Sequence, residues 1–203
     1  MATSGNIAKG QAASYVVNAA KSRFQAKAVA SGMLSAFGHN PTVAIRGFTG
    51  EASFSQEAPQ ESSLRITIDA GSLEILGDVS EKDRQEMDRM MKADVLETDR
   101  YPEIRFEGAG KVATRLAEGM YRITLDGRLT LHGVERAVEV PCNVTVGEES
   151  LRANGEFSIR QTDFQIKLVS VAGGTLKLKD ELKFTFDIVA RRRIEARNDE
   201  AEK

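Results

Sequence analysis

The chain has 203 residues, of which 41% are hydrophobic and 29% are charged, and its formal net charge is −2. This length fits one large β domain with a sizeable core. A net charge this close to zero excludes bulk electrostatic attraction, so neither nucleic acid nor anionic lipid surfaces are expected as partners. No apolar run approaches the length of a helical membrane span, so no integral membrane segment is expected.

The first ten residues, MATSGNIAKG, lack the apolar segment that a secretory signal needs, which predicts a cytoplasmic protein. The single cysteine, Cys142, cannot form an internal disulfide. Because it follows Pro141 at the end of an apolar strand, we expect a buried structural thiol and not a catalytic one.

The first part of the chain predicts short strands after a loose start. Residues 1–13 are expected to form a disordered polar lead-in, and residues 14–190 a single domain. Strand-like segments follow at Ser22–Ser31, Thr42–Phe48, Glu51–Ser55 and Ser63–Ala70. The last segment alternates most clearly between apolar and polar residues, as a strand with one buried face does.

The rhythm changes between Ser80 and Val95. Ser80 followed by Asp83 fits a capping box, which begins a helix. Four apolar residues then fall on one helical stripe, namely Met87, Met90, Met91 and Val95. This segment therefore predicts one amphipathic helix inserted into an otherwise β chain.

Strand character returns at Glu103–Lys111. The later predicted strands are Met120–Leu131, Ala137–Thr145, Leu151–Ile159 and Leu176–Ala190. Within the first of these, Tyr121, Ile123, Leu125, Leu129 and Leu131 share one parity, which indicates a half-buried strand. The polar cluster His132–Arg136 interrupts this alternation, which then resumes, as in a long hairpin. Residues 191–203 are expected to form a charged, solvated tail.

Long half-buried strands must bury their apolar faces, and one helix cannot cover them all. A sheet closed on itself solves this problem. We therefore predict an all-β fold, an antiparallel β-barrel of about eight strands with one inserted α-helix. Parity predicts a barrel interior lined by Phe24, Ile66, Ile68, Phe106, Ile123, Leu125, Phe157, Phe184 and Phe186, and the helix would add Met87 and Met91.

The sequence leaves open whether the barrel is hollow. Small residues such as Ala26, Ala28 and Ala70 would leave room for one small ligand. Periodicity reports a buried face and not an empty one, so a barrel filled with side chains is an equal alternative.

Catalytic and metal-binding patterns are not found. The two histidines, His39 and His132, each lie beside a glycine at a turn, and nothing in their spacing brings them together, so we expect structural roles. Two histidines and one cysteine far apart in sequence do not have the spacing of metal ligands, and no metal site is expected. A phosphate-binding loop and a nucleophile elbow are also missing.

Several segments resemble, in order, the motifs of the YceI-like polyisoprenoid-binding family. Residues 129–141 (LTLHGVERAVEVP) are similar to its LTLHGVTRPV segment, and residues 101–108 (YPEIRFEG) to its YPxIxF strand. The helix leading into VLETDRYP resembles the family's insertion before that strand. Residues 161–166 (QTDFQI) resemble its RSDFG element, and residues 179–190 (KDELKFTFDIVA) its closing strand. The resemblance spans about residues 14–190.

The sequence also departs from the family pattern at four positions. Gln161 and Gln165 stand where the family often has Arg and Gly, and Glu135 and Ala137 replace its Thr and Pro. The family's common export signal is missing, which agrees with an intracellular branch.

The resemblance implies a lipocalin-like, extended barrel with a helix on the lid side. It also implies a long apolar pocket for an isoprenoid chain, such as a quinone or polyprenyl tail, or for a fatty-acyl compound. It implies no enzymatic activity and no cofactor beyond the bound lipid. Head-group contacts at the barrel mouth would come from His39, Asn40 and Asp163.

We rank three functional hypotheses. The first is a non-catalytic carrier that holds an isoprenoid lipid in the barrel. The second is a structural or stress-related interaction module with a filled barrel and a protein partner. The third is a hydrolase or isomerase of small apolar molecules that uses His39 or His132. The sequence leaves a homodimer open, because a barrel edge or mouth could pair with a second copy.

Overall fold

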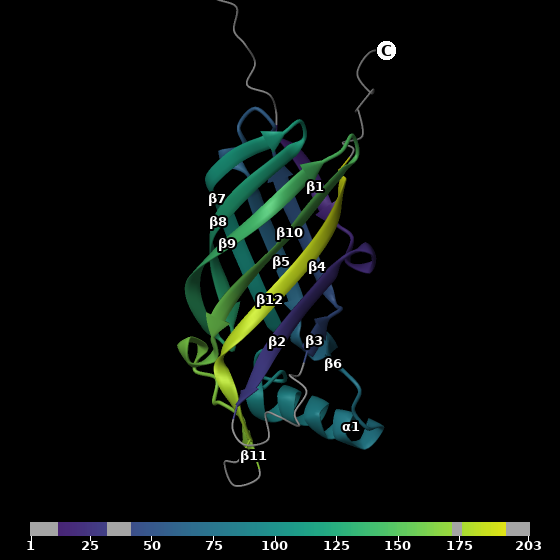
Figure 1. Ribbon diagram of the computed structural model, residues 1–203, viewed down its shortest axis with the longest axis vertical. Coiled ribbons are helices and arrows are strands. Elements are labelled where there is room, and N and C mark those ends of the chain that lie inside the picture. The colour runs from purple at the N-terminus through teal and green to yellow at the C-terminus, as the bar shows by residue number, and fades with distance from the viewer. Residues whose placement is uncertain (1–11, 32–41, 172–175, 194–203) are drawn as a thin grey trace, which may run out of the picture.

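The computed structural model describes residues 12–31, 42–171 and 176–193. Across these residues the strands form one antiparallel sheet, and an α-helix lies at one end of it (Figure 1). The strands are β1 (Ala13–Val17), β2 (Arg23–Ser31), β3 (Thr42–Ile45), β4 (Phe48–Phe54), β5 (Ser63–Asp69), β6 (Leu73–Leu76), β7 (Glu103–Ala117), β8 (Met120–Leu131), β9 (Val134–Val146), β10 (Ser150–Arg160), β11 (Ser170–Val171) and β12 (Leu176–Arg192). The helical segments are η1 (Ala19–Lys21), η3 (Pro59–Glu61), η4 (Ala70–Ser72), α1 (Glu81–Met90), the π-helical turn η5 (Met91–Val95) and η6 (Gln161–Phe164).

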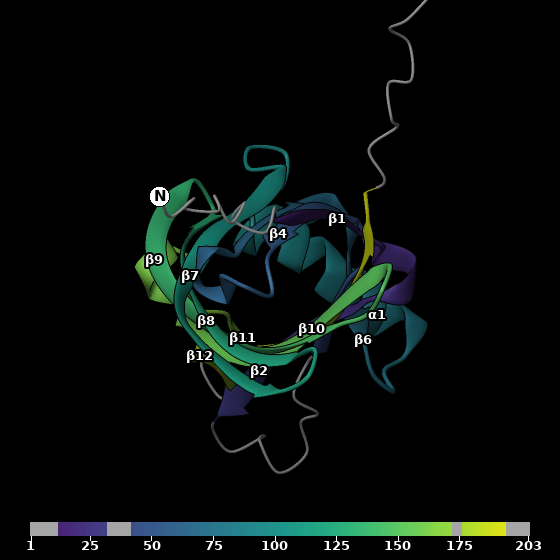
Figure 2. The same ribbon diagram turned by 90° about the horizontal axis from the view of Figure 1, so that it is seen from above.

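Eight strands close into a barrel, in the order β1, β4, β5, β7, β8, β9, β10 and β12. Strand β1 closes the ring because it pairs with β4 along one edge and with β12 along the other. The earlier part of β12, from Lys177 to Asp187, pairs with β2 instead of β1. Strands β3 and β6 then follow β2 in the sheet. Viewed from above, the strands surround a central interior (Figure 2). The predicted fold class, an all-β antiparallel barrel with one inserted helix, is confirmed.

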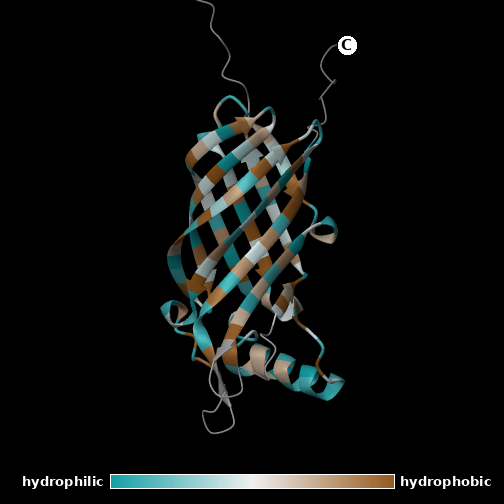
Figure 3. Cartoon of the chain, in the orientation of Figure 1, coloured by the Kyte–Doolittle hydropathy of each residue, from teal (hydrophilic) through white to brown (hydrophobic). Residues whose placement is uncertain are grey.

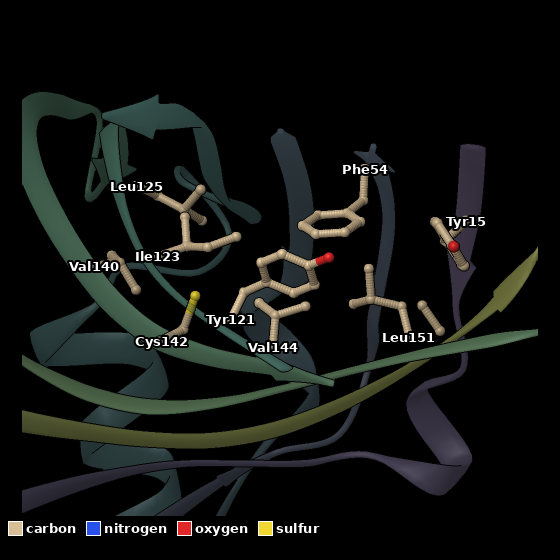
Figure 4. Packing of buried hydrophobic residues seen from close by; sticks show 10 residues of the cluster. Tyr15, Phe54, Tyr121, Ile123, Leu125, Val140, Cys142, Val144 and Leu151 are labelled. Atoms are coloured by element: carbon tan, nitrogen blue, oxygen red, sulfur yellow. The ribbon is translucent and has the colours of Figure 1, made fainter. Parts of the chain in front are cut away.

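The apolar faces of the strands form the interior, as alternation predicts. Along β8, the side chains of Tyr121, Ile123, Leu125, Leu129 and Leu131 are all buried, and the intervening charged residues are not. Figure 3 shows the resulting alternation of brown and teal bands along the strands. At one end of the barrel, the rings of Phe54 and Tyr121 meet edge to face with centroids 5.1 Å apart (Figure 4).

The hairpin of β8 and β9 is tighter than predicted. Strand β9 begins at Val134, directly opposite Leu131, and not at Ala137. The turn consists of His132 and Gly133, both with left-handed backbone angles of φ 52° and 73°. A two-residue turn of this kind matches the twist of paired strands. The polar cluster therefore does not interrupt the hairpin; it forms the turn and the first pairs of β9.

Strand β7 is longer than predicted and continues to Ala117. Its pairing with β8 shifts between Gly110 and Val112 and again between Arg115 and Ala117. Each bulge adds an unpaired residue and moves the following side chains to the other face, which removes the alternation that sequence patterns detect.

Three short strands were not predicted, namely β1, β6 and the two-residue strand β11. Strand β1 falls at the boundary of the expected lead-in, and β6 has only four residues. The segment predicted as one strand over 42–48 divides into β3 and the start of β4. At this corner, Gly47 N donates to Ser72 Oγ (2.9 Å) and Gly47 O accepts from Asp69 N (2.8 Å). These bonds join the bend between β3 and β4 to the bend between β5 and β6.

The predicted helix is confirmed at its start. Ser80 Oγ accepts from Asp83 N (3.2 Å) and donates to the Asp83 carboxylate (2.7 Å). The α-helix then changes at Met91 into a π-helical turn, in which Leu96 N donates to Met91 O (2.9 Å).

The last strand extends past the expected domain end. Strand β12 continues through Arg192, and Arg193 N donates to Ser14 O (2.7 Å) beside it. The first residues of the expected charged tail thus pair with β1.

Candidate functional site: an apolar cavity in the barrel

The barrel encloses a cavity of about 590 Å³. Small-molecule sites usually measure about 300–1,000 Å³. The cavity is also about four times larger than an engineered core void of about 150 Å³ that already binds benzene. The structure therefore resolves the alternative that the sequence left open: the interior is hollow.

All eleven residues predicted from parity and from the helical stripe lie in the cavity wall. They are Phe24, Ile66, Ile68, Met87, Met91, Phe106, Ile123, Leu125, Phe157, Phe184 and Phe186. Ala26 and Ala28 also line the cavity, whereas Ala70 begins η4 and does not. Contact of these residues with a ligand stays a prediction.

Four phenylalanines from neighbouring strands form an aromatic section of the wall. The ring of Phe24 lies 6.2 Å from that of Phe184 and 6.3 Å from that of Phe186, centroid to centroid. Phe157 stacks on Phe184 at 4.9 Å with an angle of 10° between the planes. Because β2, β12 and β10 are adjacent in the sheet, their inward positions converge here. The contacts keep these bulky rings ordered around the open space.

The inserted helix covers one end of the cavity. The cavity is lined by Met87, Met90 and Met91, by Val95 at the end of the π-helical turn, and by Leu96 directly after it. These are the residues of the predicted stripe, with Leu96 added. Methionine side chains are flexible and polarizable, so they adapt to apolar ligands of varied shape.

The wall contains further residues that the sequence analysis did not assign to the site. Leu129 and Leu131 share the parity of Leu125 and could have been included by the same signal. Ser62, Cys142 and Gln161 also line the cavity and are buried, with 5%, 7% and 3% of their surfaces exposed. Single polar residues among apolar ones carry no periodic signal, so only the fold identifies them.

The cavity wall is free of charge over the described residues, since none of the side chains that line it belongs to Asp, Glu, Lys, Arg or His. Burial in this environment raises the pKa of the Cys142 thiol to about 11. The charged form of any group is disfavoured here, because burial removes it from solvent and the described lining residues supply no counter-charge. The site is thus suited to hold an uncharged, largely apolar molecule.

Of the three predicted head-group contacts, the structure describes only Asp163. Asp163 lies in η6 with an exposed side chain and is not part of the wall. His39 and Asn40 lie outside the described residues.

His132 has structural contacts and does not line the cavity. Its Nδ1 atom lies 3.2 Å from Phe164 O, its Nε2 lies 3.6 Å from a carboxylate oxygen of Glu97, and its ring packs on Tyr101 with centroids 4.6 Å apart. These contacts join the β8–β9 turn to η6 and to the segment after the π-helical turn.

The cavity within a closed antiparallel barrel, the helix inserted before β7 and the turn at His132–Gly133 agree with one family. The sequence pattern of the YceI-like domain matches residues 15–190. The chain belongs to the YceI-like family.

Solved structures share this YceI-like fold. Burkholderia cenocepacia BcnA superposes with a TM-score of 0.63 at 22% identity, covering 85% of this chain and 98% of BcnA. A polyisoprenoid-binding domain from Saccharophagus degradans, implicated in plant cell wall breakdown, has a TM-score of 0.63 at 15% identity, with 88% and 98% covered. The Campylobacter jejuni YceI protein has a TM-score of 0.55 at 19% identity, with 75% and 85% covered. No curated protein sequence matches the chain.

The departures from the YceI-like motifs have visible structural consequences. Gln161 lies in the cavity wall, where its side-chain amide donates to Lys179 O (2.9 Å). Gln165 ends η6 in the left-handed conformation with φ 59°, which glycine adopts without strain. Glu135 and Ala137 are exposed on β9 and pair with Thr130 and Arg128.

The helix in the described part of the chain is neither long nor apolar enough to cross a membrane. Within the same part, no three side chains of His, Cys, Asp and Glu gather as metal ligands would.

Proposed function

We propose that this YceI-like protein is a non-catalytic carrier that holds an isoprenoid lipid, such as a quinone or polyprenyl tail, inside the barrel. The observation that carries this proposal is the large, uncharged cavity. A polyisoprenoid-binding domain among its structural neighbours agrees with this ligand class. The cytoplasmic location and a homodimer stay predictions.

The energetic cost of the cavity supports occupancy by a ligand. At about 24 cal/mol per Å³, an empty space of about 590 Å³ would cost about 14 kcal/mol, as much as the whole stability of about 5–15 kcal/mol of a typical domain. Water gains little there, because a buried water needs several polar partners. An apolar ligand removes this cost by contacting the wall.

The shape of the cavity favours a long chain. Residues of β12 from Leu178 to Ala190 line it. At about 3.3 Å per residue and a tilt of about 40°, this stretch covers about 30 Å along the barrel axis. Burying about 400 Å² of a flexible tail contributes about 10 kcal/mol, which supports micromolar binding after the loss of ligand freedom.

The described residues, which do not include His39, give neither alternative hypothesis a supporting observation. A filled barrel does not agree with a cavity of this size. A hydrolase or isomerase using His132 would need this ring at the cavity, and its contacts place it at a turn outside the wall.

Native mass spectrometry of the freshly purified protein, with analysis of its organic extract, tests the proposal. A stoichiometric prenylated adduct is the expected result. Absence of an adduct together with failure of added prenylquinones and prenols to bind would refute it. Phe186→Asp places a charge in the cavity and should abolish binding, whereas Thr185→Asp, on the exposed face of the same strand, should not. Circular dichroism of both variants controls for folding.

A further inference from the structure

Phe106 occupies a central position on the inward face of β7. It pairs with Ile66, the middle residue of the seven that form β5, so it lies about halfway along that strand. The buried apolar side chains form three clusters. One includes Tyr121 beside the β7–β8 turn, at the end of the barrel opposite α1 (Figure 1), one includes Ile68, and one includes Phe164 in η6. Among the described residues, Phe106 is the only one that packs against all three clusters.

Two paired glycines lie beneath the Phe106 ring. Gly108 of β7 is directly opposite Gly127 of β8, and both occupy inward positions. A Cβ added to Gly108 would lie 2.7 Å from Cζ of the ring, and one added to Gly127 would lie 2.6 Å from Cε2 and Cζ. These distances are far below the optimal separation of about 3.5–4.0 Å between carbon atoms, so the ring occupies the space that two side chains would fill. Gly108 and Gly127 thus form a glycine seat that receives the end of the ring.

With the ring on this seat, the cavity continues from one half of the barrel to the other. The same cavity is lined by Met87 and Ile68 in the half next to α1 and by Cys142 and Val144 in the far half. Phe106 is partly exposed although it faces the interior and lines this cavity, so its ring is accessible to a ligand. The two glycines are not part of the cavity wall, because the ring covers them.

Without the glycine seat, the ring would take another direction. Side chains on a strand stand roughly perpendicular to the sheet and settle in a few staggered rotamers. On the inward face of β7, the perpendicular direction crosses the cavity. A Phe106 ring displaced from the seat would therefore obstruct the passage between the two halves.

We propose that the glycine seat, by holding the Phe106 ring against the wall, makes the cavity select lipid tails long enough to extend through both halves. This role rests on the proposed lipid-binding function and specifies the tail length of the ligand. A short tail fits within one half and gains nothing from the passage. A long tail buries its additional isoprene units in the second half, so affinity rises with tail length as long as the passage is open.

Gly108→Ala is the substitution that tests the seat. The closest atoms to the new Cβ belong to the end of the Phe106 ring, and the next neighbour, Leu125 Cβ, lies at an ordinary distance of 3.4 Å. The ring can therefore move aside while the backbone stays in place. Gly127→Ala is less suitable, because its Cβ would also lie 2.8 Å from the backbone carbonyl oxygen of Glu107.

Two prenols of different length provide the readout. Geraniol and geranylgeraniol have the same hydroxyl head group and differ in the number of isoprene units. Each is titrated against delipidated wild type, Gly108→Ala, Phe106→Ala and the double variant Gly108→Ala/Phe106→Ala. Gly147→Ala is the matched control, because this glycine lies outside the cavity wall and its closest neighbour is the Ser150 side chain. Circular dichroism of each variant reports folding.

We expect wild type and Gly147→Ala to bind geranylgeraniol about a hundredfold more tightly than geraniol, because the longer tail buries more apolar area. Gly108→Ala should lower this ratio at least about tenfold, because the displaced ring obstructs only the longer tail. The double variant should regain the wild-type ratio, since no ring remains to obstruct the passage. Phe106→Ala should weaken both prenols through lost ring contacts and keep the ratio. A glycine with a merely structural role would weaken both prenols alike.

Three results would overturn the proposed selection of long tails. They are equal binding of both prenols by wild type, a wild-type ratio in Gly108→Ala, and a double variant that keeps the lowered ratio. If Gly108→Ala does not fold, Phe106→Trp takes its place: the larger ring exceeds the seat and should lower the ratio as well, and an unchanged ratio has the same meaning. If wild type binds neither prenol, the proposed function itself fails, a result distinct from prenol binding that does not depend on the seat.

Discussion

Filling the cavity with protein atoms should stabilise the lipid-free barrel and weaken lipid binding at the same time. Ala26 and Ala28 on β2 are 9% and 7% exposed, and both face the cavity. Replacing either with Leu adds three carbons that would occupy empty space. We therefore expect opposite effects on stability and on binding, which is unusual for a core substitution.

The size of the stability effect follows from the burial of these carbons. At about 0.8 kcal/mol per buried methylene, one Ala→Leu change contributes about 2.4 kcal/mol, reduced by about 1 kcal/mol for lost rotamer freedom. The net gain of about 1–2 kcal/mol should raise the melting temperature by about 3–6 °C for a chain of this length. Lipid affinity should fall at least tenfold, and further in the double variant, because the tail loses its space.

The assay compares melting temperatures of delipidated proteins with binding of a prenylquinone. Ala137→Leu is the matched control, because this alanine is exposed on the outer face of β9, and both readouts should stay near wild type. If Ala26→Leu and Ala28→Leu lower the melting temperature, as overpacking of a filled core does by about 1–3 kcal/mol, the hollow barrel is refuted. Unchanged lipid affinity with raised stability would show that the ligand binds elsewhere.

Two further predictions concern single residues. Because burial raises the pKa of Cys142 to about 11, its thiolate fraction at pH 8 should be about a hundredfold below that of a thiol with pKa 9. Alkylation by iodoacetamide, followed by mass spectrometry, should therefore be slow at pH 8 and accelerate as the pH rises towards 11. It should stop when lipid fills the cavity. An alkylation rate that does not change when lipid is added would place the ligand away from Cys142. Gly133→Ala should destabilise the barrel by about 1–3 kcal/mol, since the residue has φ 73° and its new Cβ would lie 2.5 Å from the Tyr101 ring. Gly147→Ala, at a turn glycine without such an angle, should cost less in the same denaturant titration, and equal costs would contradict the strain argument.

The sequence by itself determined which faces of the strands are buried. Alternating side chains point to opposite faces of a strand because of backbone geometry, so the parity of Ile123 and Leu125 or of Phe184 and Phe186 assigned them to the interior before any fold was known. The helix at Ser80 was predictable for the same reason, since capping and the methionine stripe are local signals. Closure into a barrel followed from the need to cover so much apolar surface with one helix.

Local patterns failed where the backbone leaves regular geometry. The bulges of β7 after Gly110 remove the alternation, and the turn at His132 requires left-handed angles that residue types other than glycine seldom adopt. In both places pairing with the neighbouring strand stabilises the conformation, and this information is not local.

Only the tertiary structure decided that the barrel is hollow and where its polar atoms lie. A buried face and a cavity wall have the same periodicity, because alternation records removal from water and not contact with other side chains. Ser62 and Cys142 are 80 residues apart in sequence, and they line one cavity only because the sheet closes into a barrel. The free volume depends on how side chains from all eight barrel strands fit together, and that fit is a property of the assembled barrel.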